Sequence, residues 1–212
     1  MSTSTRTVSS WFAGASAAAV TLAAVGTQCG APEPQPRVAV PPSAARPASV
    51  DGRAGVEAWR VVYGVLQHPR CANCHPAGDV PLQGDRMQPH MQNVQRGPDG
   101  HGLYAMRCDA CHQPHNLPGA HQPPGAPSWH LPHPDMPLVF VGRSSGELCR
   151  QLKDRARNGG KTPEQIFEHM ASEKLVLWGW DPGEGRAPVP TPHPELVRAL
   201  RIWIDSDCAC PD

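Results

Sequence analysis

Two short strings, Cys71-Ala72-Asn73-Cys74-His75 and Cys108-Asp109-Ala110-Cys111-His112, decide how the rest of this 212-residue chain is interpreted. Each string has two thiols separated by two residues, and a histidine follows the second thiol directly. With this spacing the two thiols can add to the vinyl groups on one edge of a porphyrin, and the histidine lies beneath the iron. The strings therefore predict two covalently bound haem c groups, with His75 and His112 as proximal iron ligands.

Paired C-x-x-C strings also occur in zinc ribbons, in which four Cys or His ligands surround one ion. A ribbon leaves both trailing histidines without a role, and the 32 residues between His75 and Cys108 make an unusually long ribbon loop. A disulfide or thioredoxin-like redox pair is a third use of the same spacing. Two strings that both end in histidine favour haem over either alternative.

The composition is compatible with a fold organised around cofactors. The chain has 19 basic and 19 acidic residues, which argues against a nucleic-acid-binding protein or a polybasic membrane-surface protein. It also has 26 prolines and 20 glycines, and it is poor in large aliphatic side chains. Such a chain needs disulfides, metals or a large apolar cofactor to complete its core, and two haems would do so.

Residues 1–30 are predicted to be a secretory signal. A polar start is followed by an uncharged run rich in small residues, from Trp11 to Val25, which is too alanine-rich to indicate a membrane span. Cys29 stands where a lipoprotein signal has its acylated cysteine, whereas Gln28 occupies a position that normally holds a small residue. Lipid attachment at Cys29 and loss of Cys29 with the signal therefore both remain open.

The remainder divides into a Pro/Ala-rich linker, residues 31–52, and a dihaem cytochrome c domain, residues 53–212. The signal predicts an exported, periplasmic protein, whose only membrane attachment would be a lipid on Cys29. No other segment of the sequence is long and apolar enough to span a bilayer.

Helical spacing of apolar residues is clearest at the two ends of this domain. One helix is expected to start after Asp51, as N-cap, and to lead into Cys71; the other contains the repeat Leu196, Leu200 and Trp203. Capping boxes predict two further helices, one from Ser144 to residues 158–160 and one from Thr162. The proline-rich stretch 113–137 has no period and is predicted to be a loop.

The expected fold is therefore mainly α, a cytochrome c-like dihaem domain of short helices with long Pro/Gly-rich loops. A helix entering the first string and a terminal helix crossing it resemble the class I cytochrome c arrangement. The N- and C-terminal helices are expected to pack near the haems.

From His68 onward, the sequence resembles a dihaem c-type cytochrome family named isoquinoline 1-oxidoreductase subunit. The resemblance covers nearly all of residues 60–212 and implies a link with periplasmic molybdenum hydroxylases, which oxidise N-heteroaromatics or aldehydes. No molybdopterin or iron–sulfur pattern occurs here, so it implies an electron-accepting partner of such an enzyme. The matching stretches are His68–Cys71, Pro81–Asp85, Gln95–Gly100, Pro124–Trp129, Gln151–Asp154, Asn158–Gly160, Trp178–Trp180 and Cys210–Pro211.

The sixth iron ligands are predicted in the order His90, Met136, His169. His90 lies 15 residues after His75, in a polar loop that is expected to fold back near the first haem. Met136, between two prolines, resembles the loop methionine that class I cytochromes offer, and His169 lies on a helix whose apolar face packs inward. His115 and His130 remain alternatives in the loops.

Three cysteines, Cys149, Cys208 and Cys210, lie outside the two strings and the signal. In an oxidising compartment two of them are expected to pair. The family terminus Cys210–Pro211 implies the pair Cys149–Cys210. A bond between Cys149 and Cys208, or reduced cysteines in the tail, also remains open.

Taken together, these features predict an electron-transfer protein that is not itself an enzyme. It would pass electrons from a periplasmic dehydrogenase, of the molybdenum hydroxylase kind that the resemblance implies, to a downstream cytochrome or oxidase. A dihaem peroxidase with one open haem is the first alternative, but 32 residues between the strings are too few for its two full domains. A haem-based ligand sensor is the second, and no output domain is evident.

Overall fold

Helix α1 (Gly52–Leu66) opens the part of the chain that the computed structural model describes, residues 51–212. All of these residues belong to one compact unit. Asp51 is the N-cap, as predicted, and its side chain accepts a hydrogen bond from the backbone N–H of Arg53. The helix thus begins one residue before the predicted domain boundary. The predicted signal, most of the linker and Cys29 lie outside the described residues.

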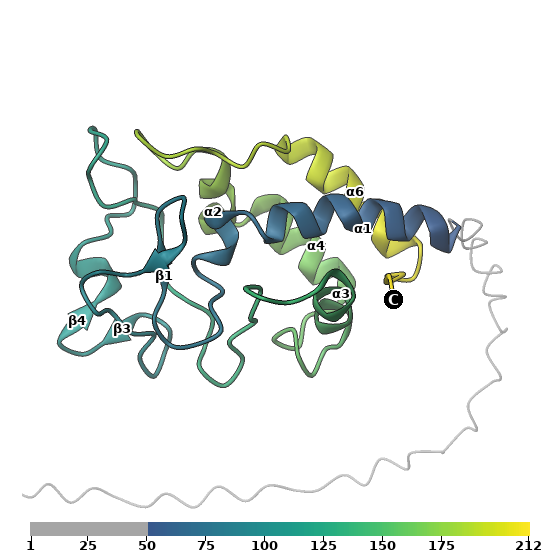
Figure 1. Cartoon of the computed structure of the whole chain (residues 1–212), viewed down its shortest axis with the longest axis horizontal. Helices are drawn as coiled ribbons and strands as arrows, with labels where there is room; N and C mark the ends of the chain where they lie inside the picture. Colours follow the sequence, from purple (N-terminus) through teal and green to yellow (C-terminus); the bar gives the residue numbers. More distant parts are fainter. Residues whose placement is uncertain (1–50) are drawn as a thin grey trace, which may run out of the picture. The chain divides into compact units, whose positions relative to one another are not determined.

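Helices and two small hairpins make up the regular structure (Figure 1). The hairpins were not predicted from the sequence; each has two-residue antiparallel strands, too short for a strand period to be visible. The elements after α1 are α2 (Pro69–Ala72), β1 (Leu82–Gln83), β2 (Gln88–Pro89), β3 (Gly102–Leu103), β4 (Met106–Arg107), the 3₁₀ turn η1 (Cys108–Ala110), α3 (Ser145–Lys153), α4 (Pro163–Ser172), α5 (Lys174–Leu177), the 3₁₀ turn η2 (Trp178–Trp180) and α6 (His193–Asp205).

The apolar core lies where α1 crosses α6. The side chains of Trp59 and Trp203 are fully buried, and their ring centroids are 5.1 Å apart. Gly55 permits this close crossing, because a Cβ at that position would collide with the side chain of Ser206 on the far side. Trp59 also donates its indole N–H to Ser145, which fastens α3 to the same crossing.

The two predicted capping boxes are present at the starts of α3 and α4. Helix α3 nevertheless ends at Lys153, earlier than predicted. The buried Asn158 amide donates to the carbonyl of Leu152 at 2.7 Å, so this carbonyl takes a side-chain donor in place of a further turn of helix. The stretch from Asp154 to Gly160 is therefore a loop.

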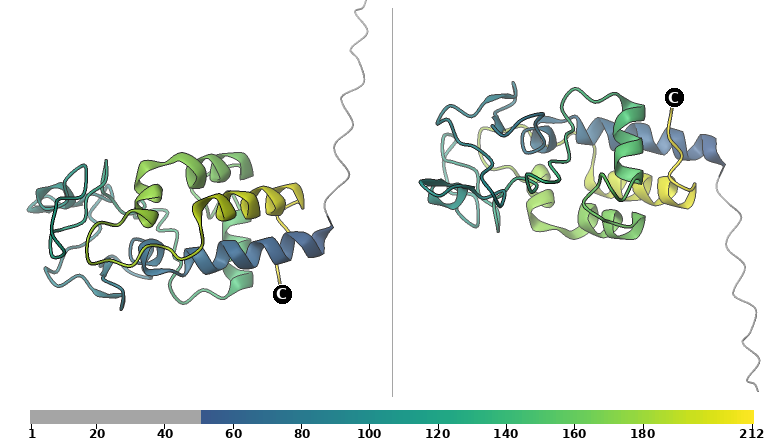
Figure 2. Two further views of the ribbon diagram at one scale, coloured as in Figure 1. Left: turned by 90° about the horizontal axis from the view of Figure 1, so that it is seen from above. Right: turned by 90° about the horizontal axis from the view of Figure 1, so that it is seen from below.

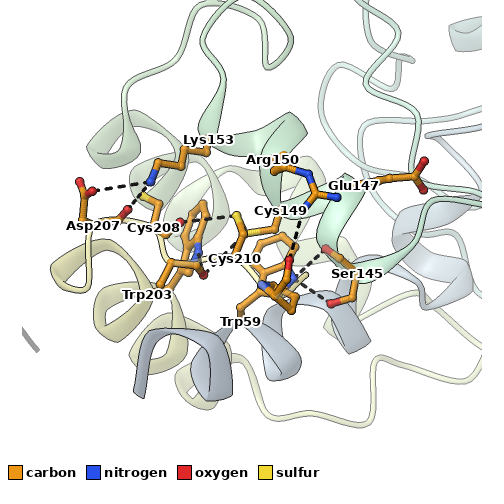
Figure 3. The surroundings of a disulfide bond; sticks show 12 residues. Trp59, Ser145, Glu147, Cys149, Arg150, Lys153, Trp203, Asp207, Cys208 and Cys210 are labelled. Carbon is orange, nitrogen blue, oxygen red and sulfur yellow. Dashed lines mark hydrogen bonds and ion pairs between the residues drawn. A yellow bond between two sulfur atoms is a disulfide. The ribbon is translucent and has the colours of Figure 1, made fainter. Parts of the chain in front are cut away.

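The C-terminal tail is held against α3 by a disulfide between Cys149 and Cys210 (Figure 3). This is the pairing that the family resemblance implies, and Cys208 is left as a buried thiol. Polar contacts reinforce the attachment, since Lys153 donates to the carbonyl of Asp207 at 2.7 Å and Trp203 donates to the carbonyl of Ala209 at 3.2 Å.

Helices α1, α3, α4 and α6 gather at one end of the described unit, and the two hairpins with their long loops lie at the other (Figures 1 and 2). The first C-x-x-C-H string begins in α2, directly after α1, and the second begins in η1, directly after the β3–β4 hairpin. Among residues 51–212, none of the helices has the length and apolar character needed to cross a bilayer.

Candidate functional site

His75 is held by the segment that precedes α3. Its Nδ1 lies 2.8 Å from the carbonyl oxygen of Leu138, and its ring stacks on Phe140 with centroids 3.8 Å apart and planes 8° from parallel. The backbone carbonyl of His75 accepts from the N–H of Phe140 at 2.9 Å. The imidazole is thus fixed in position and in rotation by one short stretch of chain.

Burial keeps this imidazole neutral. It lowers the pKa of His75 to about 4, against the opposing hydrogen bond to Leu138, and the nearby charges of His169, Arg96 and His130 lower it further. Because a carbonyl can only accept, Nδ1 carries the proton and donates it to Leu138, which leaves the lone pair of Nε2 free. A neutral ring held in this way is the usual form of a metal-ligating histidine.

His112 repeats the arrangement in the second string. Its Nδ1 lies 2.7 Å from the carbonyl oxygen of Pro124, and its ring stacks on Trp129 with centroids 4.4 Å apart and planes 3° from parallel. Burial lowers its pKa, and the hydrogen bond to Pro124 opposes that shift. Both strings therefore present a neutral histidine with a free Nε2, backed by an aromatic ring.

His90 lies opposite His112. The two ring centroids are 6.3 Å apart, with planes 67° from parallel. Two imidazoles on opposite sides of one iron, each bonded at about 2.0 Å, have centroids about 6 Å apart. The Nδ1 of His90 is buried and makes no hydrogen bond of ordinary geometry within the described part of the chain, although a contact with the side chain of Gln92 raises the pKa of the ring against the lowering effect of burial. The separation of the two rings makes His90 a candidate for a second iron ligand.

His90 was predicted to lie near the first haem, and in the structure its ring lies beside that of His112. It follows β2, and its backbone N–H donates to the carbonyl of Pro81, just before β1, at 3.0 Å. The hairpin thus places the ring beside that of His112. The sequence separation from His75 had suggested the first haem.

The remaining ligand candidates lie in different places. His169, on α4, is near enough to His75 for its charge to lower the pKa of that ring, as the charge of His90 does at His112. Met136 lies against the loop between α3 and α4, where a Cβ on Gly159 would be 3.9 Å from its Cγ. His115 is exposed at the edge of a cavity of about 270 Å³ beside Trp178.

His130 shares one property with the two proximal candidates, since its Nδ1 also donates to a backbone carbonyl, that of Ser128. Its ring lies beside that of His101, with centroids 5.1 Å apart. The charge of His130 also lowers the pKa of His75. His130 therefore remains a candidate for the sixth ligand of the first iron.

The four thiols of the strings are reduced. Burial raises the pKa of Cys71 to about 12 and that of Cys74 to about 11. The charge of a neighbouring cysteine is the second cause that raises each pKa: it is Cys74 for Cys71, and Cys108 of the second string for Cys74. The last thiol of one string and the first thiol of the other therefore lie close together.

Within residues 51–212, no three His, Cys, Asp or Glu side chains gather closely enough to hold a metal ion by themselves. A haem iron makes no such demand, because the porphyrin supplies four nitrogen ligands and the protein only the axial ones. The residues present fit such a group: Cys71, Cys74 and His75 would hold one, and Cys108, Cys111, His112 and His90 the other.

Comparison with known proteins adds no relatives, since no family model, curated protein or solved structure matches this chain. The geometry of the two strings and their surroundings is therefore the main structural guide to function.

Several residues of the site were not predicted from the sequence. The carbonyls of Pro124 and Leu138 carry no sequence signal, since every residue has a carbonyl. The ring stacked on His112 did have one: Trp129 is a large aromatic within a Pro/Gly-rich loop without period, where such a residue needs a packing partner.

Proposed function

We propose that this protein is a dihaem c-type cytochrome that transfers electrons. The observation that carries the proposal is the repeated histidine geometry. Each C-x-x-C-H histidine donates Nδ1–H to a backbone carbonyl, at 2.8 Å for His75 and 2.7 Å for His112. This leaves Nε2 free directly after a pair of reduced thiols, as a covalently held haem requires.

When bound, the two haems would supply reversible one-electron redox chemistry. The chain contributes attachment through four thiols and fixed axial imidazoles. His112 and His90 would hold the second iron between them. For the first iron, the charges of His169 and His130 both act on His75, so these two histidines are candidates for the sixth ligand beside Met136.

Filled axial positions distinguish a carrier from an enzyme. A peroxidase or a ligand sensor needs an iron with an open position, and the closeness of the His90 ring to His112, with centroids 6.3 Å apart, supports a filled position at the second iron instead. The donor is proposed to be a periplasmic dehydrogenase of the molybdenum hydroxylase kind, and the acceptor a downstream cytochrome or oxidase. The donor class extends from the sequence resemblance, and export to the periplasm from the predicted signal in residues 1–30.

The first test is haem content and spin state. The exported protein should carry two covalent haems, seen by intact mass and by the pyridine haemochrome assay, and both irons should be low-spin in the oxidised protein. Zinc in place of haem would exclude the proposal. Turnover of peroxide together with a high-spin iron in the wild-type protein would assign it to the enzyme class.

The second test is His90→Ala, which should leave both haems attached and open one iron. One high-spin signal should appear, and the reduced variant should bind one carbon monoxide per chain. The control is His115→Ala, which removes an exposed histidine that also lies near the second string. Unchanged spectra in His90→Ala would show that a different residue fills the sixth position.

A further inference from the structure

Asn73 is one of the two residues between the cysteines of the first C-x-x-C-H string, and its side chain contacts the β1–β2 hairpin. It is buried, with 8% of its surface exposed. Its side-chain amide donates to the carbonyl of Gly84 at 3.0 Å, and its backbone carbonyl accepts from the N–H of Leu82 at 2.9 Å. Asn73 therefore holds both the first strand of the hairpin and its turn.

The same hairpin delivers His90 to the second string. Its strands pair Leu82 with Pro89, and His90 follows immediately, with its backbone N–H bonded to Pro81 at 3.0 Å. A continuous set of hydrogen bonds thus runs from the first attachment string to the histidine opposite His112. Each strand of the hairpin is only two residues long, so the hairpin has little rigidity of its own.

We infer that Asn73 is a positioning residue for the second iron, acting through the hairpin on His90. The inference rests on the proposed function, and it assigns to a residue of the first string an effect at the other haem. Loss of the amide leaves the Gly84 carbonyl, in the exposed turn of the hairpin, without its side-chain donor, so His90 leaves the iron more often. A competing ligand then gains access to the second iron, while His75 and its carbonyl partner are untouched.

The test measures carbon monoxide binding to the reduced, haem-loaded full-length protein. Asn73→Ala should raise the apparent affinity of the second iron for carbon monoxide by about tenfold, the factor that one ordinary hydrogen bond contributes. Gly84→Ala should also raise the affinity for carbon monoxide, and it leaves the C-x-x-C-H string unaltered. The backbone of Gly84 has φ +70°, which strains an alanine, whereas the added Cβ meets no neighbouring atom. The matched control, Gln88→Ala, removes an exposed hydrogen bond on the same hairpin and should bind as the wild type does.

The His90→Ala background identifies the iron concerned. There the second iron is already open, so adding Asn73→Ala should leave the stoichiometry at one carbon monoxide per chain. A rise to two would show that Asn73 acts on the first iron and would overturn the inference. So would wild-type affinity in Asn73→Ala. Absence of haem from the wild-type protein would instead refute the proposed function, and the two failures are therefore distinct.

Discussion

Removal of the Cys149–Cys210 disulfide should destabilise the protein by a calculable amount. The bond closes a loop between residues 61 positions apart, and on the chain-entropy scale this corresponds to about 4 kcal/mol of unfolding free energy. The folded tail keeps its other attachments in the double variant Cys149→Ala/Cys210→Ala, because Arg150 still donates to Pro211 and Trp203 to Ala209. The loss should therefore come mainly from the greater freedom of the unfolded chain.

The assay is guanidinium unfolding of the haem-loaded protein, followed by circular dichroism with and without a reductant. Reductant should lower the stability of the wild type to that of the double variant and leave the double variant unchanged. The control, Cys208→Ala, removes a buried thiol outside the bond and should cost only about 1 kcal/mol. A loss of less than about 1 kcal/mol in the double variant would refute the reasoning.

Two further substitutions test the second string and the helical end. Gly125→Ala should disturb the low-spin spectrum of the second iron, because the new Cβ would collide with the carbonyl of His115 and displace the adjacent Pro124 carbonyl, which orients His112. The control is Gly78→Ala, where the new Cβ meets open space. An undisturbed spectrum in Gly125→Ala would count against the role of the Pro124 carbonyl. Hydrogen bonds from Arg201 lower the pKa of Glu164 below its ordinary value, so their contribution to stability is present at neutral pH and is lost as the pH falls through the lowered pKa. Glu164→Gln should accordingly flatten the decline of melting temperature in acid, and an identical acid slope in both proteins would disprove the linkage.

Local side-chain chemistry made much of the helical end predictable. Asp51, Ser144 and Thr162 each cap the helix that follows them, because a side chain that satisfies the first free N–H groups does so within a few residues. The end of α3 was not predictable in this way. It depends on Asn158, whose amide reaches back six residues to Leu152, and such a contact leaves no periodic signal.

The two C-x-x-C-H strings could be recognised in the sequence, but the histidine that lies beside His112 could not be predicted. His90 could be selected as a ligand candidate from its place in the chain, yet the iron it would serve depends on the direction in which the β1–β2 hairpin leaves Asn73. That direction depends on hydrogen bonds across the hairpin, from the Asn73 amide to Gly84 and between backbone groups, and such contacts leave no periodic signal in the sequence. The stacking of His112 on Trp129 also depends on tertiary packing, so the sequence did not identify Trp129 as the partner of His112.

His75 and His112, the proposed proximal ligands, differ in how far along the chain their carbonyl partners lie. Pro124 follows His112 by 12 residues, whereas Leu138 follows His75 by 63. Closing the longer loop costs about 1.5 kcal/mol more in chain entropy. The shorter loop lies entirely inside the longer one, so early compaction around His112 shortens the free chain that must close around His75. The nesting thus favours an order of assembly in which the inner centre forms before the outer one.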